Sequence, residues 1–184
     1  MQDIRTKLQK VDKKIKEKKY HSALDLLNNL IENESLNEEL FIKRGLIYER
    51  LRKFNEALSD YSKAISMNSS NAEIYKNRGD VKSKLKKYSE SILDYSKALE
   101  IAPLLVSAIN NRGISRETIG DLEGAFQDYS LAIKINSKFA SPYCNRGIIK
   151  DLNGDYKGSI SDHSKAIELN PRFSSAYNNR GIVK

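Results

Sequence analysis

The stretch AEIYKNRGDVKSKLKKYSESILDYSKALEIAPLL, residues 72–105, decides the fold because most of the chain repeats its pattern. Its triplet Asn-Arg-Gly at 77–79 recurs at 111–113, 145–147 and 179–181, and a weaker copy, Lys-Arg-Gly, stands at 43–45. The glycines of these triplets are spaced 34 residues apart. A fixed period of roughly 20–50 residues is the sequence signature of a repeat architecture.

Each unit of this pattern is taken to begin seven residues before its glycine, at position 1 of 34. Four clear units then span 38–71, 72–105, 106–139 and 140–173, with a divergent unit at 4–37 and a partial unit of one helix at 174–184. Large, mostly aromatic residues recur at positions 4, 17 and 24, glycine at 8, alanine or serine at 20 and alanine at 27. This spacing predicts two amphipathic helices per unit, here called helix A and helix B.

The recurring glycine needs a packing reason, because glycine inside a helix costs about 1 kcal/mol relative to alanine. We expect position 8 to admit a neighbouring helix closely, with the small residues of positions 20 and 27 opposite it. Gly120 and Gly154 mark turns between helices A and B, and Pro103 and Pro171 end their units.

The 34-residue unit with these residues, together with proline at position 32, resembles the tetratricopeptide repeat. The divergent unit keeps Tyr20 and Ala23 at positions 17 and 20 but has Val11 in place of the glycine. The resemblance implies an all-α fold, a right-handed superhelix (solenoid) of antiparallel helix pairs. It also implies that helix A lines a concave groove that binds proteins or peptides.

Two charged residues follow the same period, arginine at position 7 and aspartate at position 23. We predict one structural ion pair in each clear unit, because a bidentate guanidinium–carboxylate contact would fix the helix pair. A role for the arginines in binding a phosphate or carboxylate ligand is the alternative. The predicted pairs are Arg44 with Asp60, Arg78 with Asp94, Arg112 with Asp128, and Arg146 with Asp162.

The groove positions implied by the resemblance suggest how a partner is held. Position 6 carries Lys43 and then Asn77, Asn111, Asn145 and Asn179. Because an asparagine amide both donates and accepts, such a ladder could bind the backbone of an extended peptide. The resemblance adds that similar ladders occur in the repeats of O-GlcNAc transferase and in importin-α. A row of merely tolerated polar residues is the alternative.

The other expected groove residues change character along the chain, as a surface that selects a partner should. Charged residues prevail near the N-terminus and neutral or apolar ones near the C-terminus. We expect an extended partner segment that is partly apolar over residues 110–182. The groove residues are Lys43, Lys76, Asn77, Asp80, Asn110, Asn111, Ile114, Cys144, Asn145, Ile148, Asn178 and Asn179.

The net charge of +8 is uneven, since residues 1–20 hold eight Lys/Arg against three acidic residues, which leaves +3 for the rest. A solvated helix face explains this best, and binding of RNA or an acidic surface is the less favoured alternative. No apolar run is long enough to span a membrane, and no signal peptide is evident at the start. We therefore expect a cytoplasmic protein with one free cysteine, Cys144.

No catalytic pattern is found. The two histidines, His21 and His163, form neither a metal motif nor a paired acid–base arrangement. We expect no enzyme activity, no cofactor, no metal and no small-molecule substrate. The favoured function is a scaffold or adaptor for proteins, and the alternative is the interaction or targeting arm of a larger protein. If the natural chain ends at Lys184, another copy is expected to cover its uncapped partial unit.

Overall fold

The computed structural model describes residues 4–33 and 37–183; residues 1–3, residues 34–36 of the divergent unit and Lys184 of the partial unit lie outside the described part. Within these residues the chain forms helices and no strand, which confirms the predicted all-α class. The helices are α1 (Ile4–Lys16), α2 (Tyr20–Asn33), α3 (Glu38–Arg50), α4 (Phe54–Met67), α5 (Ala72–Lys84), α6 (Tyr88–Ile101), α7 (Val106–Thr118), α8 (Leu122–Ile135), α9 (Ala140–Leu152), α10 (Tyr156–Leu169) and α11 (Ser174–Ile182). None of the described helices is long and apolar enough to cross a bilayer.

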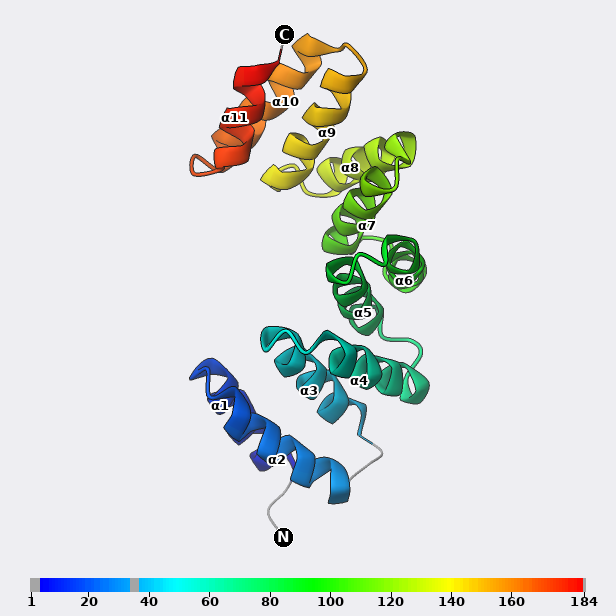
Figure 1. Ribbon diagram of the computed structural model, residues 1–184, viewed down its shortest axis with the longest axis vertical. Helices are drawn as coiled ribbons and strands as arrows, with labels where there is room; N and C mark the ends of the chain where they lie inside the picture. Colours follow the sequence, from blue (N-terminus) through cyan, green and yellow to red (C-terminus); the bar gives the residue numbers. More distant parts are fainter. Residues whose placement is uncertain (1–3, 34–36, 184) are drawn as a thin grey trace. The chain divides into compact units, whose positions relative to one another are not determined.

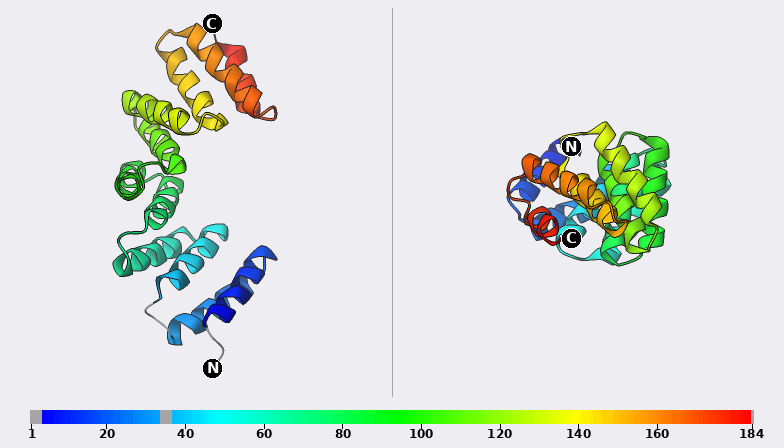
Figure 2. Two further views of the ribbon diagram at one scale, coloured as in Figure 1. Left: turned by 180° about the vertical axis from the view of Figure 1, so that it is seen from behind. Right: turned by 90° about the horizontal axis from the view of Figure 1, so that it is seen from above.

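The helices form two compact units, Met1–Leu85 with α1 to α5 and Lys86–Lys184 with α6 to α11. In the first unit each helix packs against the next helix along the chain. The same holds in the second unit, where α9 also contacts α7 and α11. Figures 1 and 2 show neighbouring helices within each unit packed side by side and running in opposite directions.

Each unit has its own apolar interior, built from the residues that follow the 34-residue period. In the first unit Tyr61 and Ala64 of α4 are buried with Ile74 and Val81 of α5. In the second unit Ala125 and Tyr129 of α8 are buried with Ile149 of α9. The divergent first pair packs Leu8, Val11, Ala23, Leu24, Leu27 and Leu30 together with Leu40 and Ile47 of α3.

The glycine of position 8 receives the aromatic ring of position 24 from the same helix pair. A Cβ atom added to Gly113 would lie 2.7 Å from Cε1 of Tyr129, which is closer than such atoms can approach. Gly45 and Gly147 face the rings of position 24 in their own pairs at 2.8 Å. The atoms nearest each of these glycines thus belong to the ring of position 24, and the packing of the small residues of positions 20 and 27 opposite the glycine stays a prediction.

Candidate functional site

The asparagines of position 6 lie on the A helices of successive pairs. Asn77 lies on α5, and Asn111, Asn145 and Asn179 lie on α7, α9 and α11. All four side chains are half-buried. Because α9 contacts both α7 and α11, the second unit carries its three asparagines at equivalent positions of adjoining helices.

These asparagines already make hydrogen bonds inside the protein. Asn179 donates through Nδ2 to Sγ of Cys144 over 3.7 Å, and Asn111 accepts at Oδ1 from Nδ2 of Asn110 over 3.1 Å. The contact of Asn179 uses one of the two N–H donors of its amide.

The orientation of Asn145 is set by a buried tyrosine. The Tyr129 hydroxyl donates to Oε2 of Glu117 over 2.6 Å, and burial together with Glu117 raises the pKa of Tyr129, so the hydroxyl stays protonated. Its one proton points at Glu117, so the hydrogen bond between Tyr129 and Asn145 must be donated by the amide N–H. The amide oxygen of Asn145 is then left to accept from another group.

Two expected groove residues are not at an open surface. Asn110 is 4% exposed and Cys144 is 2% exposed, because the A helix of the following pair packs beside position 5. Burial raises the pKa of the Cys144 thiol, although the hydrogen bond from Asn179 opposes the shift. Asn178, at the same position on α11, is exposed. The structure therefore corrects the expectation that Asn110 and Cys144 present their side chains to a ligand.

The charged residues expected near the N-terminal end of the groove form ion pairs within the first unit. Lys43 lies 2.6 Å from Asp12 and 3.3 Å from Glu39. Burial opposes its charge, but the two carboxylates outweigh burial and raise the pKa of Lys43. Lys76 lies 3.3 Å from Asp80 on the same helix. A partner must therefore compete with existing carboxylates for these lysines.

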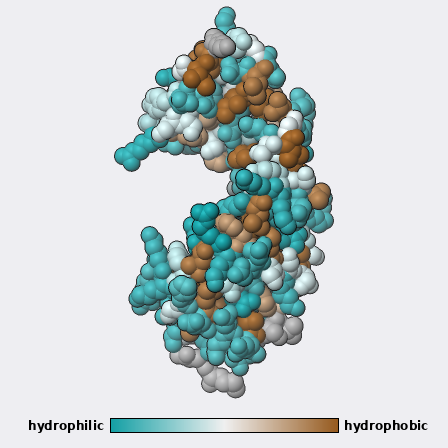
Figure 3. Space-filling view, in the orientation of Figure 1, coloured by the Kyte–Doolittle hydropathy of each residue, from teal (hydrophilic) through white to brown (hydrophobic). Residues whose placement is uncertain are grey.

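The isoleucines of position 9 give the second unit an apolar component on its A helices. Ile114 is 38% exposed and Ile148 is half-buried. Elsewhere in this unit Leu152 and Ile160 are exposed, and Figure 3 shows apolar groups over α9 and α10 among hydrophilic ones. The apolar surface is therefore spread over more than the A-helix face.

The structure brings together three of the four arginine–aspartate pairs. In each, Nε and Nη2 of the arginine donate to the two carboxylate oxygens of an aspartate on the following helix. Arg78 and Asp94 belong to different compact units, and their pairing stays a prediction. The bidentate pairs and their Nη2–Oδ1 distances are Arg44–Asp60 at 2.7 Å, Arg112–Asp128 at 2.7 Å and Arg146–Asp162 at 2.8 Å.

Each of these arginines also reaches back to the preceding helix pair, which the sequence analysis missed. Nη1 of Arg112 donates to Oγ of Ser96 on α6 over 3.2 Å, while its other nitrogens bind Asp128 on α8. One guanidinium thus joins three helices. The same contact to position 25 recurs as Arg44 to Asn28, Arg78 to Ser62, Arg146 to Ser130 and Arg180 to Ser164. The serine repeats with the same period as the arginine, so the signal was present in the sequence.

A second cation supports the aspartate in the later pairs. Arg116 donates to Asp128 over 2.9 Å, and Lys150 lies 2.9 Å from Asp162. Burial alone would raise the pKa of Asp162, but the two cations outweigh it and lower the pKa. The position of these second cations in unit 38–71 holds Tyr48 instead.

The first unit holds an open pocket of about 390 Å³ where the turn after α3 meets the end of α5. Its lining is Glu49, Arg52, Phe54 and Lys84, and Lys84 lies 2.6 Å from Glu49. None of these four residues is among the site residues predicted from the sequence. Across the described residues no three His, Cys, Asp or Glu side chains are grouped as a metal site would require.

Family models of the tetratricopeptide repeat match residues 38–71 and 72–103. No curated protein matches the sequence. Among solved structures, MamA is similar with 20% identity, a TM-score of 0.82 and coverage of 89% of this chain and 96% of its own. A tetratricopeptide repeat protein from Parabacteroides merdae has 24% identity, a TM-score of 0.85 and coverage of 97% and 71%. YrrB, titled a TPR protein with an unusual peptide-binding site, has 17% identity, a TM-score of 0.79 and coverage of 94% and 89%. At these identities the likeness shows the fold, a solenoid of helix pairs.

Proposed function

The chain is a tetratricopeptide repeat protein, and from that premise we propose that it is a non-enzymatic scaffold that holds an extended segment of a partner protein. Its fold supports the general role of a protein-interaction scaffold. The finer proposal is that the asparagines of position 6 bind the main chain of the partner. The observation that carries it is the row of Asn111, Asn145 and Asn179 on three adjoining A helices.

The hydrogen bonds around these asparagines favour binding rather than oppose it. An amide fixed by one internal bond loses little further conformational freedom when it meets a ligand. Asn145 is the clearest case, because its bond to Tyr129 leaves its oxygen to accept from a peptide N–H. A series of such amides at repeat spacing would recognise an extended main chain whatever its side chains. Exposed Ile114 would add an apolar contact beside them.

The test compares the double variant Asn111→Ala/Asn145→Ala with the wild type and with Asn153→Ala, which removes an exposed amide from a turn. Each protein is used to select peptides from a displayed library, and the best peptide is then titrated by fluorescence anisotropy. We expect the double variant to bind at least about tenfold more weakly, or 1.4 kcal/mol, while Asn153→Ala binds like the wild type. N-methylation of the peptide backbone should have a similar effect on the wild type.

Circular dichroism at the temperature of the titration ensures that all three proteins are folded. Equal affinity of the wild type and the double variant for the same peptide would show that the asparagines of position 6 do not bind the main chain of the partner.

A further inference from the structure

The turns between helices A and B divide into two kinds along the chain. The first three read Lys-Glu-Lys-Lys at 16–19, Arg-Leu-Arg-Lys at 50–53 and Lys-Leu-Lys-Lys at 84–87. The last two read Thr-Ile-Gly-Asp at 118–121 and Leu-Asn-Gly-Asp at 152–155. Positions 13, 15 and 16 are thus basic in the first three turns and carry no cation in the last two.

The backbone of these turns is the same in both kinds, although the residues differ. Position 15 has positive φ throughout: 58° at Lys18, 59° at Arg52 and 62° at Lys86, against 87° at Gly120 and 79° at Gly154. A residue with a Cβ atom is strained in this left-handed region and glycine is not. The first three turns therefore have a long basic side chain at a position where glycine, as in the last two turns, adopts the same conformation without strain.

At position 16, just before helix B, the lysines of the first turns are also less favourable for stability than the aspartates of the last two. Asp121 and Asp155 cap α8 and α10 by accepting hydrogen bonds from the backbone N–H of Gly124 and Gly158. Lys53 and Lys87 stand at the same place before α4 and α6 and make no side-chain cap. A cation at a helix N-terminus is also unfavourable for the helix dipole. Local departures from the stable choice are expected where a residue serves binding.

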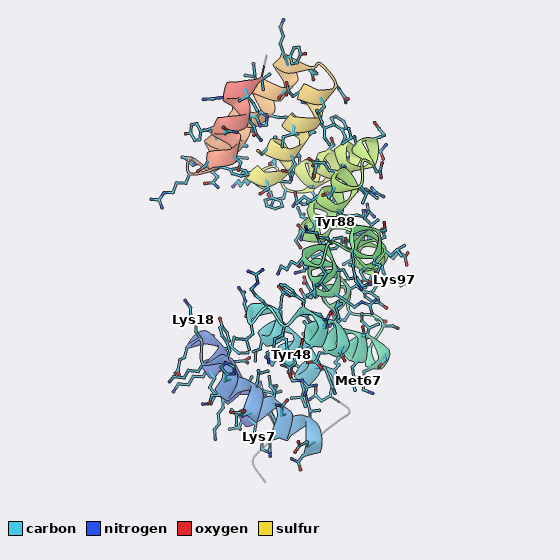
Figure 4. All side chains as sticks on the ribbon, in the orientation of Figure 1. Lys7, Lys18, Tyr48, Met67, Tyr88 and Lys97 are labelled. Atoms are coloured by element: carbon cyan, nitrogen blue, oxygen red, sulfur yellow. The ribbon has the colours of Figure 1, made fainter. Side chains whose placement is uncertain are left out.

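Within the first unit the basic turns lie at one edge. Because successive helices are antiparallel, the α1–α2 turn, the α3–α4 turn and the end of α5 lie on the same side of the unit (Figure 1). Lys18 marks the first of these turns in Figure 4. The pocket lined by Arg52 and Lys84 shows that the second turn and the end of α5 adjoin. The basic edge consists of Lys16, Lys18, Lys19, Arg50, Arg52, Lys53 and Lys84, all of which are exposed.

We propose that this basic edge of the first unit is a second binding surface, separate from the asparagine ladder, and that it takes an acidic segment of a protein. Charge complementarity calls for an anionic partner, because the edge carries seven cations; Lys19 pairs with Glu17 and Lys84 pairs with Glu49. Glu49 in the pocket would repel a phosphate but can accept a backbone N–H of a peptide.

The edge fits the other anionic macromolecules less well. Single-stranded RNA is usually bound with exposed aromatic rings on which bases stack, whereas Tyr20 and Phe54 at these turns are half-buried. A membrane surface is usually bound with exposed apolar side chains that enter the lipid, whereas Leu51 is half-buried. A flexible acidic segment needs neither feature.

The test converts the basic turns to the form of the last two, in the variants Arg52→Gly/Lys53→Asp and Lys18→Gly/Lys19→Asp of the full chain. A labelled glutamate-rich peptide is titrated by fluorescence anisotropy at low and at physiological ionic strength. We expect each variant to bind at least about tenfold more weakly than the wild type and the wild-type affinity to fall with salt. The melting temperature of each variant should rise, because glycine relieves the left-handed strain at position 15.

The matched control is Lys134→Gln/Lys138→Asp in the second unit, which removes the same three charges (one at Gln and two at Asp) from exposed positions. It should bind the peptide like the wild type. An oligouridylate and phosphatidylserine vesicles are the alternative ligands. The proposal is overturned if the wild type does not bind the peptide, if the turn variants bind as well as the control, or if RNA or vesicles bind more tightly. Variants of the asparagine ladder should leave this binding unchanged, so failure of one proposal is distinguishable from failure of the other.

Discussion

The same substitution at position 8 should have opposite effects at two places in the second unit. In Gly113→Ala the new Cβ atom would lie 2.7 Å from Cε1 of Tyr129. In Gly181→Ala it would meet no atom within 4 Å. Both glycines lie in helices of the same unit, α7 and α11, so both gain helix propensity from alanine. Only the first substitution has to move a neighbour.

The magnitudes follow from what can move. The Tyr129 ring is fully buried, and its hydroxyl is held 2.6 Å from Glu117, so the ring cannot retreat without losing that hydrogen bond. Overpacking of this kind costs about 1–3 kcal/mol, against up to about 1 kcal/mol gained in helix propensity. We expect Gly113→Ala to lower the free energy of unfolding by about 1–2 kcal/mol. Gly181→Ala should raise the stability of its own helix by up to about 1 kcal/mol.

Urea unfolding followed by circular dichroism measures the first effect. Hydrogen exchange followed by mass spectrometry assigns each effect to its helices, α7 and α8 for Gly113→Ala and α11 for Gly181→Ala. Gly45→Ala, which faces Tyr61 at 2.8 Å, serves as an independent copy of the first variant. A neutral Gly113→Ala would refute the argument, since the ring would then not be fixed against the glycine.

Three further outcomes can be measured on the same preparations. Arg44→Ala should lower the free energy of unfolding by about 3–5 kcal/mol, because it removes the cation that binds the buried carboxylate of Asp60. Arg112→Ala should cost less, because Arg116 remains 2.9 Å from the carboxylate of Asp128. Burial lowers the pKa of His163 below its ordinary value near 6.5. Its contribution to stability is therefore present above that pH and is lost as the pH falls through the folded-state pKa. In His163→Tyr the urea midpoint should depend less on pH below about pH 6.5. Cys144 should react slowly with a thiol reagent in the native protein and rapidly in urea, and fast native labelling would contradict its burial.

The period of the sequence was enough to predict the all-α fold and the tetratricopeptide repeat. The reason is that a pattern recurring at a fixed spacing gives each helix pair the same structure and the same packing against its neighbours. The arginine and the aspartate could be proposed as partners for the same reason, since both follow the period. Ser96 and its equivalents follow it too, but a small polar residue on a helix has no single expected role, and their contact with the arginine was not foreseen.

The exposure of the groove residues was harder to predict. Position on a helix indicates which face a side chain takes, but it does not say how closely the next A helix approaches. Cys144 and Asn110 became buried because an adjoining helix lies beside them, as the hydrogen bond from Asn179 to Cys144 shows. The left-handed conformation of Lys18 and Arg52 could not be predicted from the sequence either. All five turns share this backbone geometry, but only two of them have the glycine that would indicate it.

The arginine that joins three helices couples the stability of neighbouring helix pairs. In the one-dimensional description of repeat proteins, stability is the sum of an intrinsic term for each repeat and a coupling term for each pair of neighbours. Arg112 contributes to both terms at once, because it binds Asp128 within its own pair and Ser96 in the pair before. Opening one pair therefore weakens its neighbour. Within each compact unit, a partner segment that orders one pair should lower the population in which the next pair is open, so that order spreads along the chain without a change in shape.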